Sequence, residues 1–217
     1  MLKTTEKILR EKMIRVARLL HQKNLVAATD GNISVKFGDG LLTTPSGVNK
    51  AFLEEEQILT VDFAGRVIEG QGQPTSELAM HLAVYRLRPE VEAVIHAHPP
   101  LATALSLAGA SLNQFVLPEV VLSLGVIPTA AYATPTTGEV PLAIRELIKH
   151  YDALILERHG ALTVGRDLLE AYNKMEKLEH TALIIFAAMQ LGGVKALPAH
   201  EVEKLLMMKI SQKLQTS

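Results

Sequence analysis

The sequence contains no cysteine, which excludes disulfide bonds and thiolate metal ligands. Tryptophan is absent and aromatic residues make up only 4% of the chain, so the core must consist mainly of leucine, valine, isoleucine and alanine. No apolar run approaches the roughly 20 residues that a helix needs to span a bilayer. Residues 1–7 also lack the apolar core of a signal peptide. We therefore expect a cytoplasmic protein without membrane contact.

No block of like charge is present either. The 22 basic and 23 acidic residues leave a net charge of −1, which gives no indication of nucleic-acid binding. Hydrophobic residues make up 48% of the 217 positions and charged residues 21%, as in a globular protein with a full core. We expect a single domain spanning 1–217, although the length would also allow two small domains.

Hydrophobic periodicity and turn residues divide the chain into helices and strands. Helices are expected at 4–23, 76–87, 99–108, 138–150, 167–189 and 198–213. Strands are expected at 33–37, 41–44, 58–62, 66–69, 91–98, 126–131, 153–156 and 161–164. The hairpin signals do not alternate strictly with helices, which favours one α/β domain with a central, mainly antiparallel or mixed sheet flanked by helices. A parallel, doubly wound sheet is the alternative.

Three histidines stand at the ends of strand-like runs. His96 and His98 close the run that begins at Val91, and because side chains on a strand alternate between faces, the two imidazoles point the same way. His159 follows a second apolar run and precedes Gly160. Histidines at strand ends also cap sheets or bond carbonyl groups. Three neutral imidazoles with an open fourth position are nevertheless typical of a catalytic zinc site, and we predict a metal ion at this point.

Glu77 is the candidate acid/base. It lies at the expected start of a helix, near the positive end of the helix dipole, where a merely stabilising glutamate is also common. His81 follows one turn later on the same face, with Tyr85 after it. His81 is either a further metal ligand or a buried structural histidine, and its position favours the second interpretation.

Three short loops combine small residues with hydroxyl or amide side chains, namely 31–34, 44–47 and 75–76. Small residues let backbone N–H groups approach an anion, and hydroxyl groups add donors. Turns are rich in the same residues, so each loop alone is a weak signal. Neither a phosphate-binding Gly-Lys-Ser/Thr loop nor a dinucleotide-binding glycine pattern is present.

Taken together, these motifs resemble the class II aldolase/adducin family over residues 8–190. The most specific stretch runs from Ser76-Glu77 through His81, Tyr85, Arg88-Pro89 and Ala93-Val94 to His96-x-His98. Further landmarks, in matching order and spacing, are Gly31-Asn32-Ile33-Ser34, Thr44-Pro45-Ser46-Gly47, Tyr132-Ala133-Thr134 and His159-Gly160.

The resemblance implies a central, mostly antiparallel sheet with helices on both sides, a homotetramer with active sites at subunit boundaries, and a phosphorylated sugar as substrate. It also implies that His96, His98 and His159 bind Zn²⁺ or another divalent ion such as cobalt, manganese or iron. Glu77 would be the catalytic acid/base. The positions that the resemblance assigns to the substrate phosphate are Gly31, Asn32, Ser46, Gly47, Thr75 and Ser76.

The implied reaction is the cleavage of a ketose phosphate to dihydroxyacetone phosphate and an aldehyde. Epimerases of the family tend to have aspartate in place of Glu77, and adducin-like heads lack the metal histidines, so both features favour an aldolase over a 4-epimerase or a non-catalytic module. Methylthioribulose-1-phosphate dehydratase and sugar-acid phosphate decarboxylase remain alternatives. The segment 115–120, where aldolases supply a tyrosine for the aldehyde oxygen, has none. Glu119 either takes over a polar role there or is a surface residue.

Overall fold

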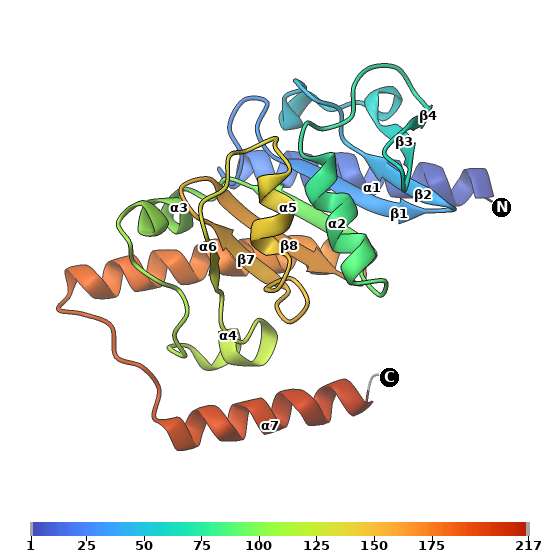
Figure 1. Cartoon of the computed structure of the whole chain (residues 1–217). Coiled ribbons are helices and arrows are strands. Elements are labelled where there is room, and N and C mark those ends of the chain that lie inside the picture. Colours follow the sequence, from blue (N-terminus) through green and yellow to red (C-terminus); the bar gives the residue numbers. More distant parts are fainter. Residues whose placement is uncertain (1, 216–217) are drawn as a thin grey trace.

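The computed structural model describes residues 2–215 (Figure 1). The sequence predicts a single domain spanning 1–217, and the first and last residues of that range lie outside the described part of the chain. The helices of the described part are α1 (Leu2–Gln22), α2 (Leu78–Leu87), α3 (Pro100–Leu107), α4 (Pro118–Ser123), α5 (Glu139–Ile144), α6 (Leu168–Gln190) and α7 (Ala199–Gln215), with 3-10 turns at Lys50–Phe52 and Glu55–Gln57. The strands are β1 (Asn32–Phe37), β2 (Gly40–Thr43), β3 (Leu59–Asp62), β4 (Val67–Glu69), β5 (Ala93–Ala97), β6 (Thr129–Ala130), β7 (Ala153–Leu156) and β8 (Gly160–Gly165).

All the described strands form one sheet, in the order β4-β3-β2-β1-β5-β8-β7-β6. Neighbouring strands are antiparallel, except for the parallel pair β6 and β7. Helices cover both faces: α1 and α6 lie behind the sheet in Figure 1, and α2 and α5 lie in front of it. The predicted fold class is therefore confirmed, and the parallel, doubly wound alternative is wrong.

Strand β5, at the centre of the sheet, contributes side chains to the hydrophobic layers on both faces of the sheet. Ala93, Ile95 and Ala97 are buried in the cluster beneath α1 and α6, whereas Val94 belongs to the cluster beneath α2. Because side chains alternate, His96 lies on the same face as Val94. The alternation therefore places this histidine on the side of the sheet from which α2 approaches.

The structure confirms most predicted elements and corrects several of them. The first hairpin turns at Gly38 and Asp39, one residue earlier than expected, because Phe37 pairs with Gly40. The strand expected at 126–131 is only Thr129–Ala130, since these residues alone pair with β7. The helix expected at 138–150 ends at Ile144 and continues as turns. Helix α4, which begins at Pro118, was not predicted.

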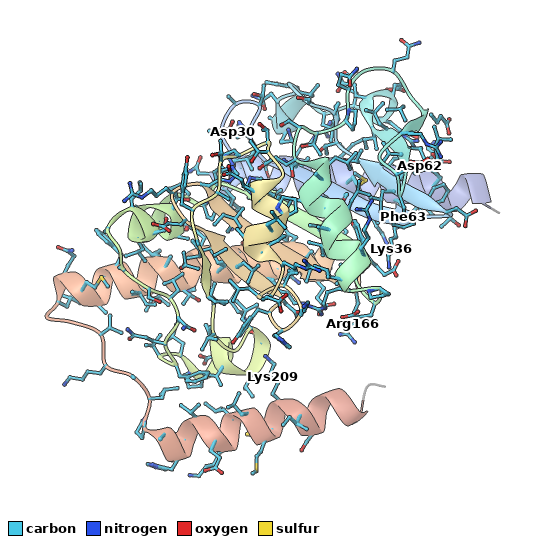
Figure 2. All side chains as sticks on the ribbon, in the orientation of Figure 1. Asp30, Lys36, Asp62, Phe63, Arg166 and Lys209 are labelled. Carbon is cyan, nitrogen blue, oxygen red and sulfur yellow. The ribbon has the colours of Figure 1, made fainter. Side chains whose placement is uncertain are left out.

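The C-terminal helix α7 lies apart from the sheet and packs against α4 (Figure 1). Lys209, labelled in Figure 2, points from α7 toward α4 and donates to the Ser123 carbonyl oxygen at 3.3 Å. Within residues 2–215, no helix combines the length and the apolar character required to cross a bilayer.

Candidate metal and acid/base site

The three predicted metal histidines meet at one end of the sheet. His96 is the penultimate residue of β5, His98 follows that strand directly, and His159 lies in the turn between β7 and β8. One nitrogen atom from each ring lies within 4.8 Å of the other two. Strand pairing produces this convergence, because β5 and β8 are neighbours and His96 stands opposite Leu162.

Hydrogen bonds indicate which ring nitrogen each histidine offers. His96 Nδ1 lies 2.9 Å from the Ala161 carbonyl oxygen, which can only accept, so Nδ1 carries the proton and Nε2 is left with its lone pair. Nε2 of His96 faces Nε2 of His98 at 2.9 Å. Asp30, labelled in Figure 2, stands on the opposite side of the His98 ring, with Oδ2 3.5 Å from Nδ1. Two lone-pair nitrogens therefore point at one another.

Burial favours the neutral form of His98 and His159. It lowers the pKa of His159 to about 4, with a further contribution from the neighbouring His96 ring. It also lowers the pKa of His98, again with a contribution from His96. Since only a neutral imidazole can bind a metal, the environment favours the ligand form at neutral pH.

Glu77 is the N-cap residue of α2, but its carboxylate does not cap that helix. The side chain is 8% exposed and turns toward the histidines. Oε2 accepts from Asn32 Nδ2 at 3.0 Å and lies 3.0 Å from His96 Nε2, whereas Oε1 lies 3.5 Å from His159 Nε2. Burial alone would raise the pKa of Glu77, but the close contact with His96 and the Asn32 N–H lower it well below its usual range.

The donor set fits a divalent cation. Glu77 Oε1 is buried without a hydrogen-bond partner among the described residues, which is costly for a carboxylate oxygen unless a cation or a proton is supplied. The three imidazole nitrogens beside it are soft enough for Zn²⁺ and also suit several other divalent ions. Carboxylate and imidazoles together can hold an ion and exchange a proton next to it.

The three loops predicted to bind phosphate lie together beside this cluster. Backbone hydrogen bonds join Ser46 N to the Gln73 carbonyl oxygen at 3.0 Å and Thr75 N to the Thr44 carbonyl oxygen at 3.1 Å. Ser46, Gly47 and Ser76 are exposed and accessible to a ligand, whereas Gly31, Asn32 and Thr75 are buried. Gly31 and Gly47 have φ angles of 70° and 73°, a region that other residues rarely adopt. The assignment of these six residues to a phosphate remains a prediction.

Lys50 bridges the segments that directly precede the loop 31–34 and directly follow the loop 44–47, and it was not predicted. Its side chain is 1% exposed, and Nζ donates to the Thr29 carbonyl oxygen at 3.1 Å and to the Val48 carbonyl oxygen at 2.8 Å. Burial lowers the pKa of Lys50 to about 8, although the charge of Asp30 opposes the shift. It is the only basic residue in the segments 26–35, 43–53 and 70–77. Its position only three residues after Gly47 was the available signal.

His81 does not join the metal cluster; its ring is fully buried and bonds Ser34 and Asn32 instead. The structural interpretation of His81 is thus the one that the contacts support. Glu119 is exposed in the first turn of α4.

Comparison with known proteins decides the family. The model of the class II aldolase and adducin N-terminal domain matches residues 11–186. The chain belongs to the class II aldolase and adducin family. L-fuculose phosphate aldolase of Methanococcus vannielii is 38% identical over 172 residues, which cover 79% of this chain and 92% of the relative. The 3-oxo-tetronate 4-phosphate decarboxylase of Escherichia coli is 35% identical over 207 residues, covering 92% and 96%.

Solved structures of the family share this fold. An L-fuculose 1-phosphate aldolase superimposes with a TM-score of 0.85 at 30% identity, covering 92% of this chain and 95% of the other. YgbL from Escherichia coli, described by three alternative activities (aldolase, epimerase or decarboxylase), gives 0.87 at 33% identity, covering 93% and 99%. The class II aldolases of this family are metal-dependent, and the three histidines provide a site that could bind a metal.

Proposed function

We propose that this chain is a zinc-dependent sugar-phosphate aldolase, which reversibly cleaves a ketose phosphate to dihydroxyacetone phosphate and an aldehyde. The observation that carries the proposal is the placement of the buried Glu77 carboxylate against His96 and His159, with one oxygen left unpartnered. Similarity to the fuculose phosphate aldolases supports the choice of reaction.

His96, His98 and His159 would hold the ion. When bound there, a divalent cation stabilises the negative charge that develops on the enediolate oxygens as the carbon–carbon bond breaks. Glu77 delivers a proton to the enediolate carbon in the cleavage direction and removes it in the reverse direction. Its Oε2 is held by Asn32, so Oε1 is the oxygen that exchanges the proton.

The phosphate group is assigned to the three joined loops. Backbone N–H groups at Gly31 and Gly47 and the hydroxyl groups of Ser46, Thr75 and Ser76 would provide its donors. Binding energy from this remote group positions the reacting carbon against Glu77, which accelerates the reaction without direct participation in the bond change.

Decarboxylation of a 3-oxo acid phosphate is a second candidate function. It is favoured by the similarity to the Escherichia coli decarboxylase, which extends over 92% of this chain at 35% identity. Loss of CO₂ from a 3-oxo acid also leaves an enolate that needs charge stabilisation and a proton, so the same residues would serve. The absence of tyrosine in the segment 115–120 is consistent with a reaction that releases no aldehyde.

Product analysis separates the two reactions. The metal-loaded protein is incubated with a panel of ketose 1- and 5-phosphates and with 3-oxo-tetronate 4-phosphate, and products are followed by NMR. An aldehyde together with dihydroxyacetone phosphate supports the aldolase. If the only reaction is release of carbon dioxide from the 3-oxo acid, the protein is a decarboxylase and the aldolase proposal is wrong. An epimer or a dehydrated product would contradict both proposals.

The role of Glu77 is tested by Glu77→Gln, which keeps the shape of the side chain but removes the base. The parent should exchange solvent deuterium into dihydroxyacetone phosphate, and the variant should lose about 10²–10⁴-fold in that rate. Metal content should stay the same because the three histidines remain. Glu11→Gln, at an exposed position of α1, is the matched control. Exchange at the parent rate in Glu77→Gln would contradict the assignment.

We also propose that the protein is a homotetramer with active sites shared between chains, as the family resemblance implies. Light scattering at assay concentration tests this point. A fully active monomer would contradict the proposal.

A further inference from the structure

A chain of buried polar side chains leads from the interior to Glu77. His81 lies on α2, one turn after Glu77, and is fully buried although it belongs to no metal cluster among the described residues. Its Nε2 lies 2.6 Å from Asn32 Oδ1, and its Nδ1 lies 2.6 Å from Ser34 Oγ. The Tyr85 hydroxyl group lies 2.9 Å from Ser34 Oγ. Both ring nitrogens therefore have a partner, and neither points at the metal histidines.

The carboxylate at the end of this chain determines the direction of every hydrogen bond in it. An ionised Glu77 can only accept, so the Asn32 amide must present its nitrogen to Glu77 and its oxygen to His81. His81 must then carry its proton on Nε2. A neutral ring with that tautomer accepts at Nδ1, and Ser34 Oγ donates to it. Burial lowers the pKa of His81 to about 3, which keeps the ring neutral at physiological pH.

The other tautomer would reverse the arrangement. With the proton on Nδ1, Nε2 would become an acceptor and would face the amide oxygen of Asn32. The amide would then turn its oxygen toward Glu77, and two acceptors would meet in a buried site, which is costly. The His81 tautomer and the Glu77 carboxylate therefore favour the same orientation of Asn32, and in that orientation Asn32 anchors Oε2 of Glu77.

We propose that His81 is a positioning residue for Glu77 and that it acts through the Asn32 amide. The inference rests on the proposed role of Glu77 as acid/base. By fixing Oε2, the chain leaves Oε1 as the oxygen with a free lone pair beside His159. Without the Nε2–H of His81, Asn32 loses one of the two partners that hold its amide in place, and Asn32 and Glu77 can rotate away from the position in which Glu77 exchanges the proton.

Two amide substitutions form a matched pair. The amide nitrogen of a glutamine reaches the position of histidine Nε2, whereas the amide of an asparagine reaches only the position of Nδ1. His81→Gln therefore keeps a donor toward Asn32, and His81→Asn keeps a partner only for Ser34. Both variants bury a neutral amide, so their folding costs should be similar, and thermal unfolding of each provides the check.

The expected difference is in kcat. Loss of a supporting hydrogen-bond partner behind an active-site group commonly reduces activity about 10–100-fold, and we expect this loss in kcat for His81→Asn with little change in KM. His81→Gln should retain most of the parent kcat. Equal losses in both variants, in proportion to their loss of stability, would overturn the inference.

A double-variant cycle tests whether His81 acts through Asn32. In an Asn32→Ala background, His81→Asn should not lower the rate of deuterium exchange any further, because the Asn32 amide that links His81 to Glu77 is already missing. If the two effects on the logarithm of the rate simply add, His81 acts independently of Asn32 and the inference is wrong.

A measurement without turnover separates this inference from the proposed function. Long-range ¹H–¹⁵N spectra of histidine-labelled protein should show His81 with its proton on Nε2 across the neutral pH range, and a proton on Nδ1 would overturn the inference. If Glu77→Gln leaves turnover intact, the proposed function fails and the inference falls with it. If Glu77→Gln abolishes turnover while His81→Asn keeps the parent kcat, the inference alone fails.

Discussion

Gly160 is the residue at which a single methyl group should damage the candidate metal site most directly. It is the first residue of β8 and immediately follows His159. A methyl carbon added to it would overlap the Ala97 carbonyl oxygen and would lie 2.8 Å from His98 Cδ2 and 3.2 Å from His96 Cε1. Each neighbour belongs either to β5 or to a histidine of the cluster, so relief of the overlap must move the site.

The magnitude follows from these contacts. Overpacking of a well-packed interior typically costs about 1–3 kcal/mol, and we expect Gly160→Ala to lower the free energy of unfolding of the metal-free protein by this amount. Displacement of two histidine rings should also weaken metal binding. A loss of about 1.4 kcal/mol in binding free energy corresponds to tenfold, and we expect at least this effect.

Two measurements separate these effects. Urea unfolding of the metal-free protein gives the steric cost, and competition with a chromophoric chelator gives the metal affinity. Gly138→Ala is the matched control, because Gly138 has a φ of −67° and no atom within 4 Å of an added methyl group. The control should bind metal normally and gain about 0.4–1 kcal/mol from a less flexible unfolded chain. Parent stability and parent metal affinity in Gly160→Ala would refute the reasoning.

Three further predictions concern single side chains. His96→Ala should empty the metal site and abolish activity, measured by elemental analysis, whereas His180→Ala, at an exposed position of α6, should keep its metal. Between pH about 8 and 10.5 the unfolded chain holds more protons at Lys50 than the folded one, so the stability of the parent in urea should rise with pH relative to that of Lys50→Met. Parallel pH profiles of the two proteins would contradict this. Asp167→Ala removes the side chain that accepts a hydrogen bond from Glu170 N at 2.8 Å. The free energy of unfolding, measured by thermal unfolding, should fall by about 0.5–2 kcal/mol, and an unchanged melting curve would contradict this.

The metal histidines could be predicted because the signal is local. A His-x-His pair at a strand end places two imidazoles on one face by the twofold period of the strand, and no distant contact is needed to see it. The approach of His159 to this pair depends on the pairing of β5 with β8, with Ala97 opposite Ala161. Sequence periodicity alone does not give that register; the family resemblance supplied it.

Helix α4 illustrates where local signals failed. Its six residues include Val120 and Val121, which have low helix propensity, and a six-residue helix is unstable by itself. Burial of both valines and packing against α7 stabilise it instead. Similarly, the apolar run 126–131 forms a strand only at Thr129–Ala130, because only these residues find a partner in β7. Tertiary contacts decided both cases.

The polar chain behind Glu77 could not be predicted because its members are remote in sequence and ordinary in type. A buried histidine, asparagine and serine are individually unremarkable, and their roles emerge only when the strand β1 and the helix α2 are placed together. A buried polar network is tolerated only if its members satisfy one another. Among the described residues, only two buried polar side-chain atoms lack a hydrogen-bond partner, namely Thr103 Oγ1 and Glu77 Oε1. The second lies at the end of an otherwise satisfied network, 3.5 Å from His159 Nε2, and a cation bound at this point would supply the partner that Oε1 lacks.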